Sequence, residues 1–232
     1  MAVAKALFFG GNWKAAMTPQ QTREFFHKFA TTVYNRQDKL RETGTRVVIA
    51  PPASSLTTAR TEINNRRVDE LVDLAIQDPW HNAGAYTGAE TLAVATDRNV
   101  QARYAIIGHS ETREPVRMIE DATYGLLENT LKSSTAEQVG LLERFVLEAT
   151  KLDADQPPAM RLAFNAVINR MVKETLKVGM TPILCVGETA FDRDYDETEK
   201  VVLGQLTAGL AGITAMEAAR VIVAYEPVWA IG

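Results

Sequence analysis

Side chains that could carry out acid/base chemistry follow three short apolar segments of this sequence. Asn12 and Lys14 come directly after the first of these segments, His109 after the fourth and Glu226 after the sixth. If they converge, a lysine, an imidazole and a carboxylate make a site for proton transfer with a cation to stabilise negative charge. None of these residues is diagnostic alone.

Each of them also has an ordinary structural explanation. A lysine near a glycine-rich turn is more often a solvated loop charge, and Lys14 fits that description. His109 follows a buried apolar segment, where a structural histidine with satisfied hydrogen bonds is about as frequent as a catalytic one. Glu226 is the most suggestive, because it stands between VIVAY and Pro227, where a buried strand reaches the surface. A structural ion pair would explain it equally well.

Other chemistries lack their motifs. No GxGxxG or GxxxxGK[ST] follows an apolar segment, so the usual nucleotide-binding loops are missing. Ser110 lies in GHSE and does not form a GxSxG elbow. The three histidines, His27, His81 and His109, match no zinc spacing with Cys185. We therefore expect no metal and no cofactor.

The elements that must position these residues are apolar segments without polar alternation, which is typical of strands buried on both faces of a parallel sheet. Helical patterns lie between them, and the first has Thr18 as its N-cap, followed by Pro19 and by Gln21 to complete a capping box. Strand and helix in alternation predict a βα series, in which strand ends gather the reacting groups. The predicted strands are Ala6–Gly10, Arg46–Ala50, Leu71–Gln77, Tyr104–Gly108, Pro182–Val186 and Val221–Tyr225.

Composition and charge exclude further classes of protein and indicate the cellular compartment. The chain has 232 residues, of which 46% are hydrophobic and 23% charged, with a formal net charge of -4 and scattered basic residues. We expect no nucleic-acid partner, and no membrane span, because no apolar run reaches about 18 residues. A single cysteine, Cys185, favours a reducing compartment, so we expect a cytoplasmic protein.

With these residues in place, the sequence closely resembles the triosephosphate isomerase family. The resemblance implies an α/β fold, the (β/α)8 TIM barrel, of which this chain covers about six strand-helix units. It also implies the interconversion of dihydroxyacetone phosphate and glyceraldehyde 3-phosphate through an enediolate, without a cofactor. The matching segments are FFGGNWK (8–14), VVIAPP (47–52), GAYTG (84–88), IIGHSETR (106–113), TPILCVGET (181–189) and AYEPVWAIG (224–232).

The resemblance assigns roles to the candidate residues. Glu226 matches the base that moves a proton between two adjacent carbons. His109 matches a neutral imidazole that polarises the carbonyl and shuttles protons between the oxygens. Lys14 matches the ammonium group that stabilises the developing charge, and Asn12 an amide near the same oxygen. Such pKa-tuned pairs are the established pattern for this enzyme.

Further residues are assigned supporting roles by the same resemblance. Ser110 and Glu111 match the residues that support the histidine and lysine, and Gly232 lies inside the lid that closes over the substrate. Thr87 matches the loop tip that reaches into a neighbouring subunit, which implies a homodimer. One position departs from the pattern, because Thr112 stands where the family usually carries a second arginine.

Two features of chain length also depart from the family. The interval between the fourth and fifth apolar segments is about twice the others, which predicts a helical insertion over residues 115–162 within one domain of residues 1–232. The sequence stops at Gly232, before the last strands and the glycine-rich phosphate-binding backbone of the family. We therefore expect an incomplete barrel that binds phosphate weakly and closes no lid.

Two rival functions stay open. A non-catalytic binding or assembly module derived from a barrel predicts that Glu226→Gln leaves function intact, whereas an isomerase loses most of its turnover. A different aldose-ketose isomerase on the same fold is disfavoured, because the residues matched to catalysis all stand in their expected contexts. Fold alone would not separate these possibilities.

Overall fold

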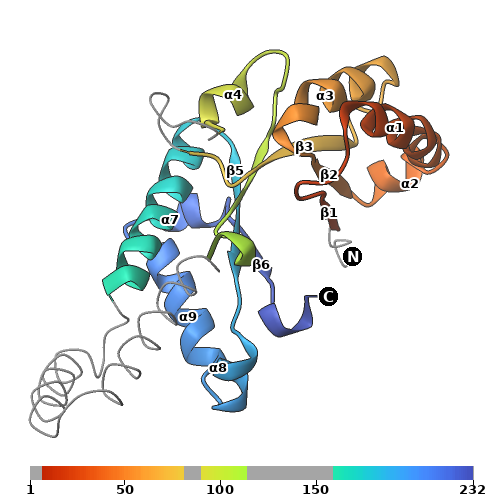
Figure 1. Cartoon of the computed structure of the whole chain (residues 1–232). Coiled ribbons are helices and arrows are strands. Elements are labelled where there is room, and N and C mark those ends of the chain that lie inside the picture. Colours follow the sequence, from red (N-terminus) through yellow and green to blue (C-terminus); the bar gives the residue numbers. More distant parts are fainter. Residues whose placement is uncertain (1–6, 81–89, 114–158, 232) are drawn as a thin grey trace, which may run out of the picture.

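The computed structural model describes residues 7–80, 90–113 and 159–231 (Figure 1). Within them, six strands form one sheet in the order β1-β2-β3-β4-β5-β6, and every neighbouring pair is parallel. A strand order that follows the chain without reversal is that of a singly wound barrel and differs from a doubly wound sheet. The predicted parallel α/β fold is confirmed. The strands are β1 (Phe8–Asn12), β2 (Arg46–Ala50), β3 (Val72–Gln77), β4 (Tyr104–Ile107), β5 (Thr181–Val186) and β6 (Ile222–Tyr225).

Five predicted strands agree with the structure to within one residue at each end, but the first was placed two residues too early. The glycines after Phe9 were expected to form a turn, and they continue the strand instead. Gly11 and Asn12 stand in register with Ile49 and Ala50 of β2, and Trp13 N donates to Ala50 O at 2.9 Å. Main-chain pairing therefore carries the strand through a segment that has no apolar signal.

Helices follow the strands as the βα series requires. The capping box predicted for α1 is present, because Gln21 N donates to Thr18 Oγ1 at 3.3 Å and Thr18 N donates to Gln21 Oε1 at 2.9 Å. The helical elements are α1 (Pro19–Tyr34), α2 (Gln37–Glu42), η1 (Ala53–Ser55), α3 (Leu56–Asn65), α4 (Leu92–Thr96), α7 (Ala159–Lys177), α8 (Ala190–Asp194), α9 (Thr198–Gly209), α10 (Ala215–Ala218) and η2 (Val228–Ala230).

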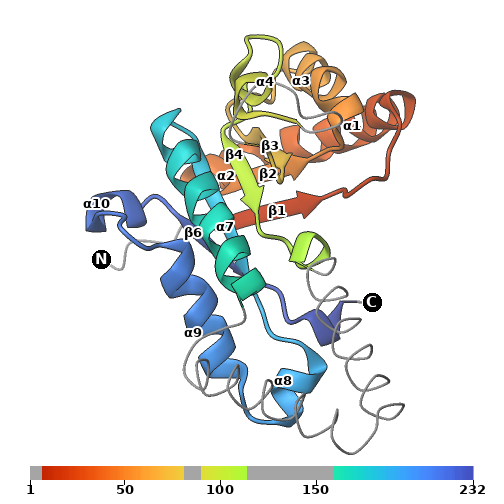
Figure 2. The same cartoon turned by 60° about the vertical axis from the view of Figure 1, so that its left-hand side comes forward.

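The sheet divides its side chains between two clusters. Residues such as Ile49 and Leu184 pack against the helices, including the fully buried Phe26 of α1, and α7 and α9 lie side by side along β5 (Figure 2). Alternate strand residues, among them Val48 and Cys185, form a second cluster made of strand residues alone. The two clusters are the outer and inner faces of a curled sheet, as in a barrel wall.

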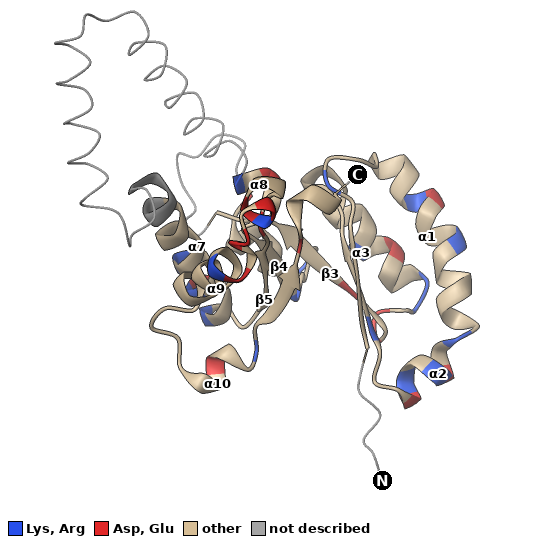
Figure 3. Ribbon diagram, turned by 90° about the horizontal axis from the view of Figure 1, so that it is seen from below, with Lys and Arg blue, Asp and Glu red and all other residues tan. Residues whose placement is uncertain are grey.

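Charged side chains gather on the helices rather than on the strands. Both basic and acidic residues lie along α1, α2 and α8 (Figure 3). Across the described residues, no helix is long and apolar enough to cross a membrane, and no group of three or more metal-ligating side chains is present.

Three sequence predictions concern residues that the structure does not describe. Thr87, Gly232 and most of the predicted insertion, residues 115–158, lie outside the described residues. The last four positions of the predicted insertion, residues 159–162, belong to the start of α7.

Candidate active site

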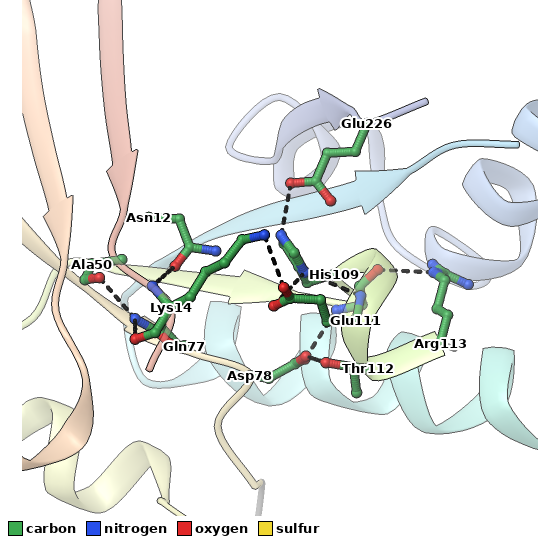
Figure 4. Close-up of polar contacts among 11 residues, drawn as sticks. Asn12, Lys14, Ala50, Gln77, Asp78, His109, Glu111, Thr112, Arg113 and Glu226 are labelled. Carbon is green, nitrogen blue, oxygen red and sulfur yellow. Dashed lines mark hydrogen bonds and ion pairs between the residues drawn. The ribbon is translucent and has the colours of Figure 1, made fainter. Parts of the chain in front are cut away.

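The four residues matched to catalysis lie together at the carboxyl ends of three strands (Figure 4). Asn12 is the last residue of β1, and Lys14 follows two positions later. His109 follows β4 by two residues, and Glu226 comes directly after β6. His109 Nε2 lies 3.3 Å from Glu226 Oε1, so residues 117 positions apart in the chain share one site. The rim of the sheet therefore brings an imidazole, a carboxylate and a lysine together.

His109 is held in one orientation by the turn that follows it. Its carbonyl accepts from Thr112 N at 2.9 Å and from Arg113 N at 3.1 Å, which starts a helical turn over residues 110–113. Within that turn, Glu111 N donates to His109 Nδ1 at 3.2 Å. A nitrogen that accepts a hydrogen bond carries no proton, so in the neutral ring the proton is assigned to Nε2, facing Glu226. The imidazole is thus arranged as a hydrogen-bond donor toward the site.

Glu226 combines a fixed backbone with a sparsely satisfied carboxylate. Its N–H donates to Val186 O at 2.8 Å, which extends the pairing of β5 and β6 beyond the strand. Its Oε2 atom is buried, and no N–H or O–H group of the described residues donates to it. Burial raises the pKa of the neighbouring Cys185 thiol, and the charge of Glu226 raises it further. A carboxylate with an unused oxygen beside a protonated thiol is suited to accept a proton.

Lys14 has a backbone conformation that few lysines adopt. Its φ is 52°, and its N–H donates to Asn12 Oδ1 at 2.9 Å. Gln77 Nε2 holds the same segment by donating to Lys14 O at 3.0 Å and to Ala50 O at 2.8 Å. A left-handed residue other than glycine costs roughly 1–2 kcal/mol. The contacts with Asn12 and Gln77 hold the residue in this conformation and so fix where its side chain starts.

The lysine head group is paired but remains accessible. Lys14 Nζ lies 2.8 Å from Glu111 Oε1, and the two side chains are 41% and 54% exposed. An ion pair at such exposure contributes about 0–1 kcal/mol, so little free energy holds the ammonium group against Glu111. Glu111 Oε2 also lies 3.6 Å from His109 Nδ1. Glu111 therefore touches both the lysine and the histidine.

The other predicted supporting residue makes less contact. Ser110 opens the helical turn after His109, and its side chain makes no hydrogen bond with any described residue. Its supporting role stays a prediction from the family resemblance.

Two residues that the sequence analysis did not select also shape the site. Gln77 holds the Lys14 segment, and Arg113 joins the residue before His109 to β5, because its Nε donates to Gly108 O at 2.8 Å and its Nη2 to Cys185 O at 3.1 Å. Burial lowers the pKa of Arg113. Gln77 could have been found by the rule that found the others, because it ends β3 at the same rim.

A buried acid supports the segment that follows Glu226. Glu188 is 1% exposed, and its carboxylate accepts from Tyr225 Oη at 3.0 and 3.1 Å and from Trp229 Nε1 at 2.8 Å. The guanidinium carbon of Arg193 lies 3.7 Å from the centroid of the Trp229 ring, a cation–π distance. These contacts hold η2, and with it the backbone after Glu226, against the end of β5.

A singly wound parallel sheet with a base, an imidazole and a cation at the carboxyl ends of its strands defines an enzyme of the βα-barrel class. Comparison with known proteins gives the family. The family model for triosephosphate isomerase matches residues 7–134 and 160–232, which include Asn12, Lys14, His109 and Glu226. The chain belongs to the triosephosphate isomerase family.

Individual relatives agree with this assignment. The chain is 30% identical to the triosephosphate isomerase of Solibacter usitatus (strain Ellin6076) over 225 residues, which cover 96% of this chain and 67% of the relative. It is 30% identical to that of Roseiflexus sp. (strain RS-1), over 96% of this chain and 65% of the relative. For Nostoc punctiforme (strain ATCC 29133 / PCC 73102) the identity is 29%, over 98% and 70%. The chain spans about two thirds of the length of these relatives.

Proposed function

We propose that this site interconverts dihydroxyacetone phosphate and glyceraldehyde 3-phosphate. The observation that carries the proposal is the arrangement of His109 and Glu226, in which an imidazole N–H faces a carboxylate across 3.3 Å beside the Lys14 ammonium group. Proton transfer between two adjacent carbons needs a base at the carbons, a donor at the oxygens and a cation to stabilise negative charge. The three side chains supply these groups.

The chemistry follows from these positions. The carboxylate of Glu226 removes a proton from one carbon of the substrate, and the electron pair moves onto the carbonyl oxygen. His109 Nε2–H donates to the oxygens of the resulting enediolate and moves a proton between them, while Lys14 and Asn12 stabilise the negative charge. Glu226 then returns its proton to the neighbouring carbon, so no atom is gained or lost. Because a 3.3 Å separation leaves no room for a carbon between the two groups, the carboxylate of Glu226 must move when substrate binds.

The test is an isomerase assay with dihydroxyacetone phosphate on the chain and on its Glu226→Gln variant. Because the chain spans about two thirds of its relatives, the assay is run on the 232 residues and on the same chain extended by two further βα units of the family. We expect Glu226→Gln to lower kcat by about 10²–10⁴-fold in the form that is active. Activity that survives the substitution, or no activity in either form, would contradict the proposal.

The proposal also covers the oligomeric state of the protein, its insertion and its location in the cell. By the family resemblance, Thr87 contributes to a homodimer and Gly232 to substrate binding, and residues 115–162 form a helical insertion. A cytoplasmic location is supported by the single cysteine, Cys185, which is buried and unpaired. Light scattering on purified protein tests the dimer, with a mass equal to one chain as the result against it.

A further inference from the structure

Asp78 connects the end of β3 with the turn that carries His109. It directly follows Gln77 and has a φ of 38°, a left-handed conformation that aspartate tolerates better than most residues. Its Oδ1 atom accepts from Gly108 N at 3.0 Å, and its Oδ2 atom accepts from the hydroxyl of Thr112 (Figure 4). One carboxylate therefore binds both ends of the segment in which His109 stands.

This segment decides which proton His109 presents. The bond from Glu111 N to His109 Nδ1 forms only while residues 110–113 are wound as a helical turn beside the ring. Gly108 and Thr112, the two residues bound by Asp78, lie on either side of His109 and Glu111. If the turn rotated or slid, the Glu111 N–H would leave Nδ1, and either ring nitrogen could then carry the proton.

The Asp78 carboxylate is buried, and both its hydrogen bonds and its charged neighbours affect its pKa. Burial raises the pKa of Asp78, while the hydrogen bonds from Thr112 and Gly108 and the charges of His109 and Arg113 oppose that rise. Buried carboxylates are retained where their hydrogen bonds are satisfied, and here each oxygen has a donor. The hydroxyl at position 112 also gives a structural use to a residue that departs from the family pattern.

We propose that Asp78 and Thr112 are a positioning pair that keeps His109 in the tautomer with its proton on Nε2. The inference rests on the proposed function for its importance to turnover, but the tautomer itself can be observed without substrate. Neither residue touches the groups that exchange protons, so both act through the turn. The site would then depend on a contact between β3 and the residues after β4 as well as on the catalytic side chains.

The experiment compares substitutions that keep or remove the Thr112 hydroxyl. Thr112→Val removes the donor at nearly constant volume, and Thr112→Ser keeps it. Thr61→Val is the matched control, since the Thr61 hydroxyl of α3 is exposed and only bonds Thr57 O at 2.9 Å. Nitrogen-15 spectra of histidine-labelled full-length protein report the tautomer of each ring, and the signals of His109 are those lost in His109→Gln.

In the unsubstituted chain we expect His109 to give the pattern of a single Nε2–H tautomer. In Thr112→Val it should move toward a mixture of tautomers, with kcat lowered roughly tenfold to a hundredfold and KM changed less than twofold, which corresponds to the loss of one hydrogen bond to a carboxylate. Thr112→Ser should restore both measurements. If Thr112→Val fails to fold, Asp78→Ala, which removes the acceptor of both hydrogen bonds, should give the same shift toward a mixture of tautomers, and an unchanged His109 spectrum there contradicts the proposal.

An unchanged His109 spectrum in Thr112→Val overturns the proposal, as does an equal change in Thr61→Val or a loss of the pattern in Thr112→Ser. Failure of the proposed function gives a different result, because turnover would then be insensitive to Glu226→Gln while the His109 spectrum still responds to position 112.

Discussion

Gly187, the residue after β5, allows the backbone there to pass against the backbone of the proposed base. A Cβ atom added at Gly187 would lie 1.8 Å from the carbonyl oxygen of Glu226, 2.5 Å from its carbonyl carbon and 3.2 Å from Pro227 N. Gly187 is also held on its other side, since its N–H donates to Gln205 Oε1 at 2.9 Å and its carbonyl accepts from Gln205 Nε2 at 3.1 Å. We predict that Gly187→Ala displaces Glu226.

The size of the effect can be worked from these distances. Ordinary contact begins at 3.4 Å, so the carbonyl of Glu226 must retreat by about 1.6 Å, or Gly187 must give up its contacts with Gln205. Forcing a methyl group into a packed site costs about 1–3 kcal/mol of unfolding free energy. A catalytic group misplaced by about 1 Å can cost about 10²-fold in rate. Both losses are expected together, because the same atoms cause them.

The assay pairs urea unfolding with isomerase turnover in Gly187→Ala and in a control. Gly204→Ala serves as the control, because Gly204 lies in α9 and nothing would lie within 4 Å of its new Cβ atom. The control should gain about 0.5–1 kcal/mol of stability, since alanine is favoured over glycine in a helix. If Gly187→Ala unfolds and turns over like Gly204→Ala, the close approach of the two backbones does not position the base.

Three further predictions test other parts of the structure. Cys185 should react with iodoacetamide far more slowly in the folded chain than in urea, because burial raises its thiol pKa, and mass spectrometry of timed samples measures the ratio. Thr18→Ala should lower the unfolding free energy by about 1 kcal/mol in urea titrations, because it removes the cap that binds Gln21 N, and Thr18→Ser should retain most of it. Burial raises the pKa of Asp73 although Arg103 opposes this, so the stability that Asp73 contributes is present below its unfolded pKa and is lost as the pH rises through the folded value. Unfolding free energies at several pH values between about 3 and 7 should therefore shift in favour of Asp73→Asn as the pH rises, and a constant difference would contradict the assignment.

The fold was predictable wherever an apolar pattern accompanied an element. Strands β2 to β5 are buried through most of their length, and β6, although half-buried to exposed, has the same apolar sequence; β1 instead continues through Gly10, Gly11 and Asn12 because of its pairing with β2. Glycines and an asparagine carry no hydrophobic signal, so the sequence placed a turn there.

The reacting side chains of the site were predictable from the sequence, but the hydrogen bonds that position them were not. Lys14, His109 and Glu226 were found because each follows a strand, and strand ends meet at one rim. Gln77 ends β3 and Asp78 follows it, so the same rule places both at this rim, but the rule does not give their partners, which are main-chain atoms and a hydroxyl far along the chain, 63 residues away for Gln77 and Lys14. Contacts of this kind depend on how strand ends come together in space, and no periodicity or motif marks them.

The contacts of Trp229 make its fluorescence a probe of the backbone beside Glu226. The emission of an indole depends on the polarity and hydrogen bonding around it, and Trp229 is anchored by the Glu188 carboxylate and covered by Arg193. If η2 moved away from the end of β5, the Trp229 ring would lose its contacts with the Glu188 carboxylate and the Arg193 guanidinium and would contact water instead. With Trp13 and Trp80 replaced by phenylalanine, the fluorescence of the remaining tryptophan would follow, in real time, whether the backbone beside Glu226 is seated or released.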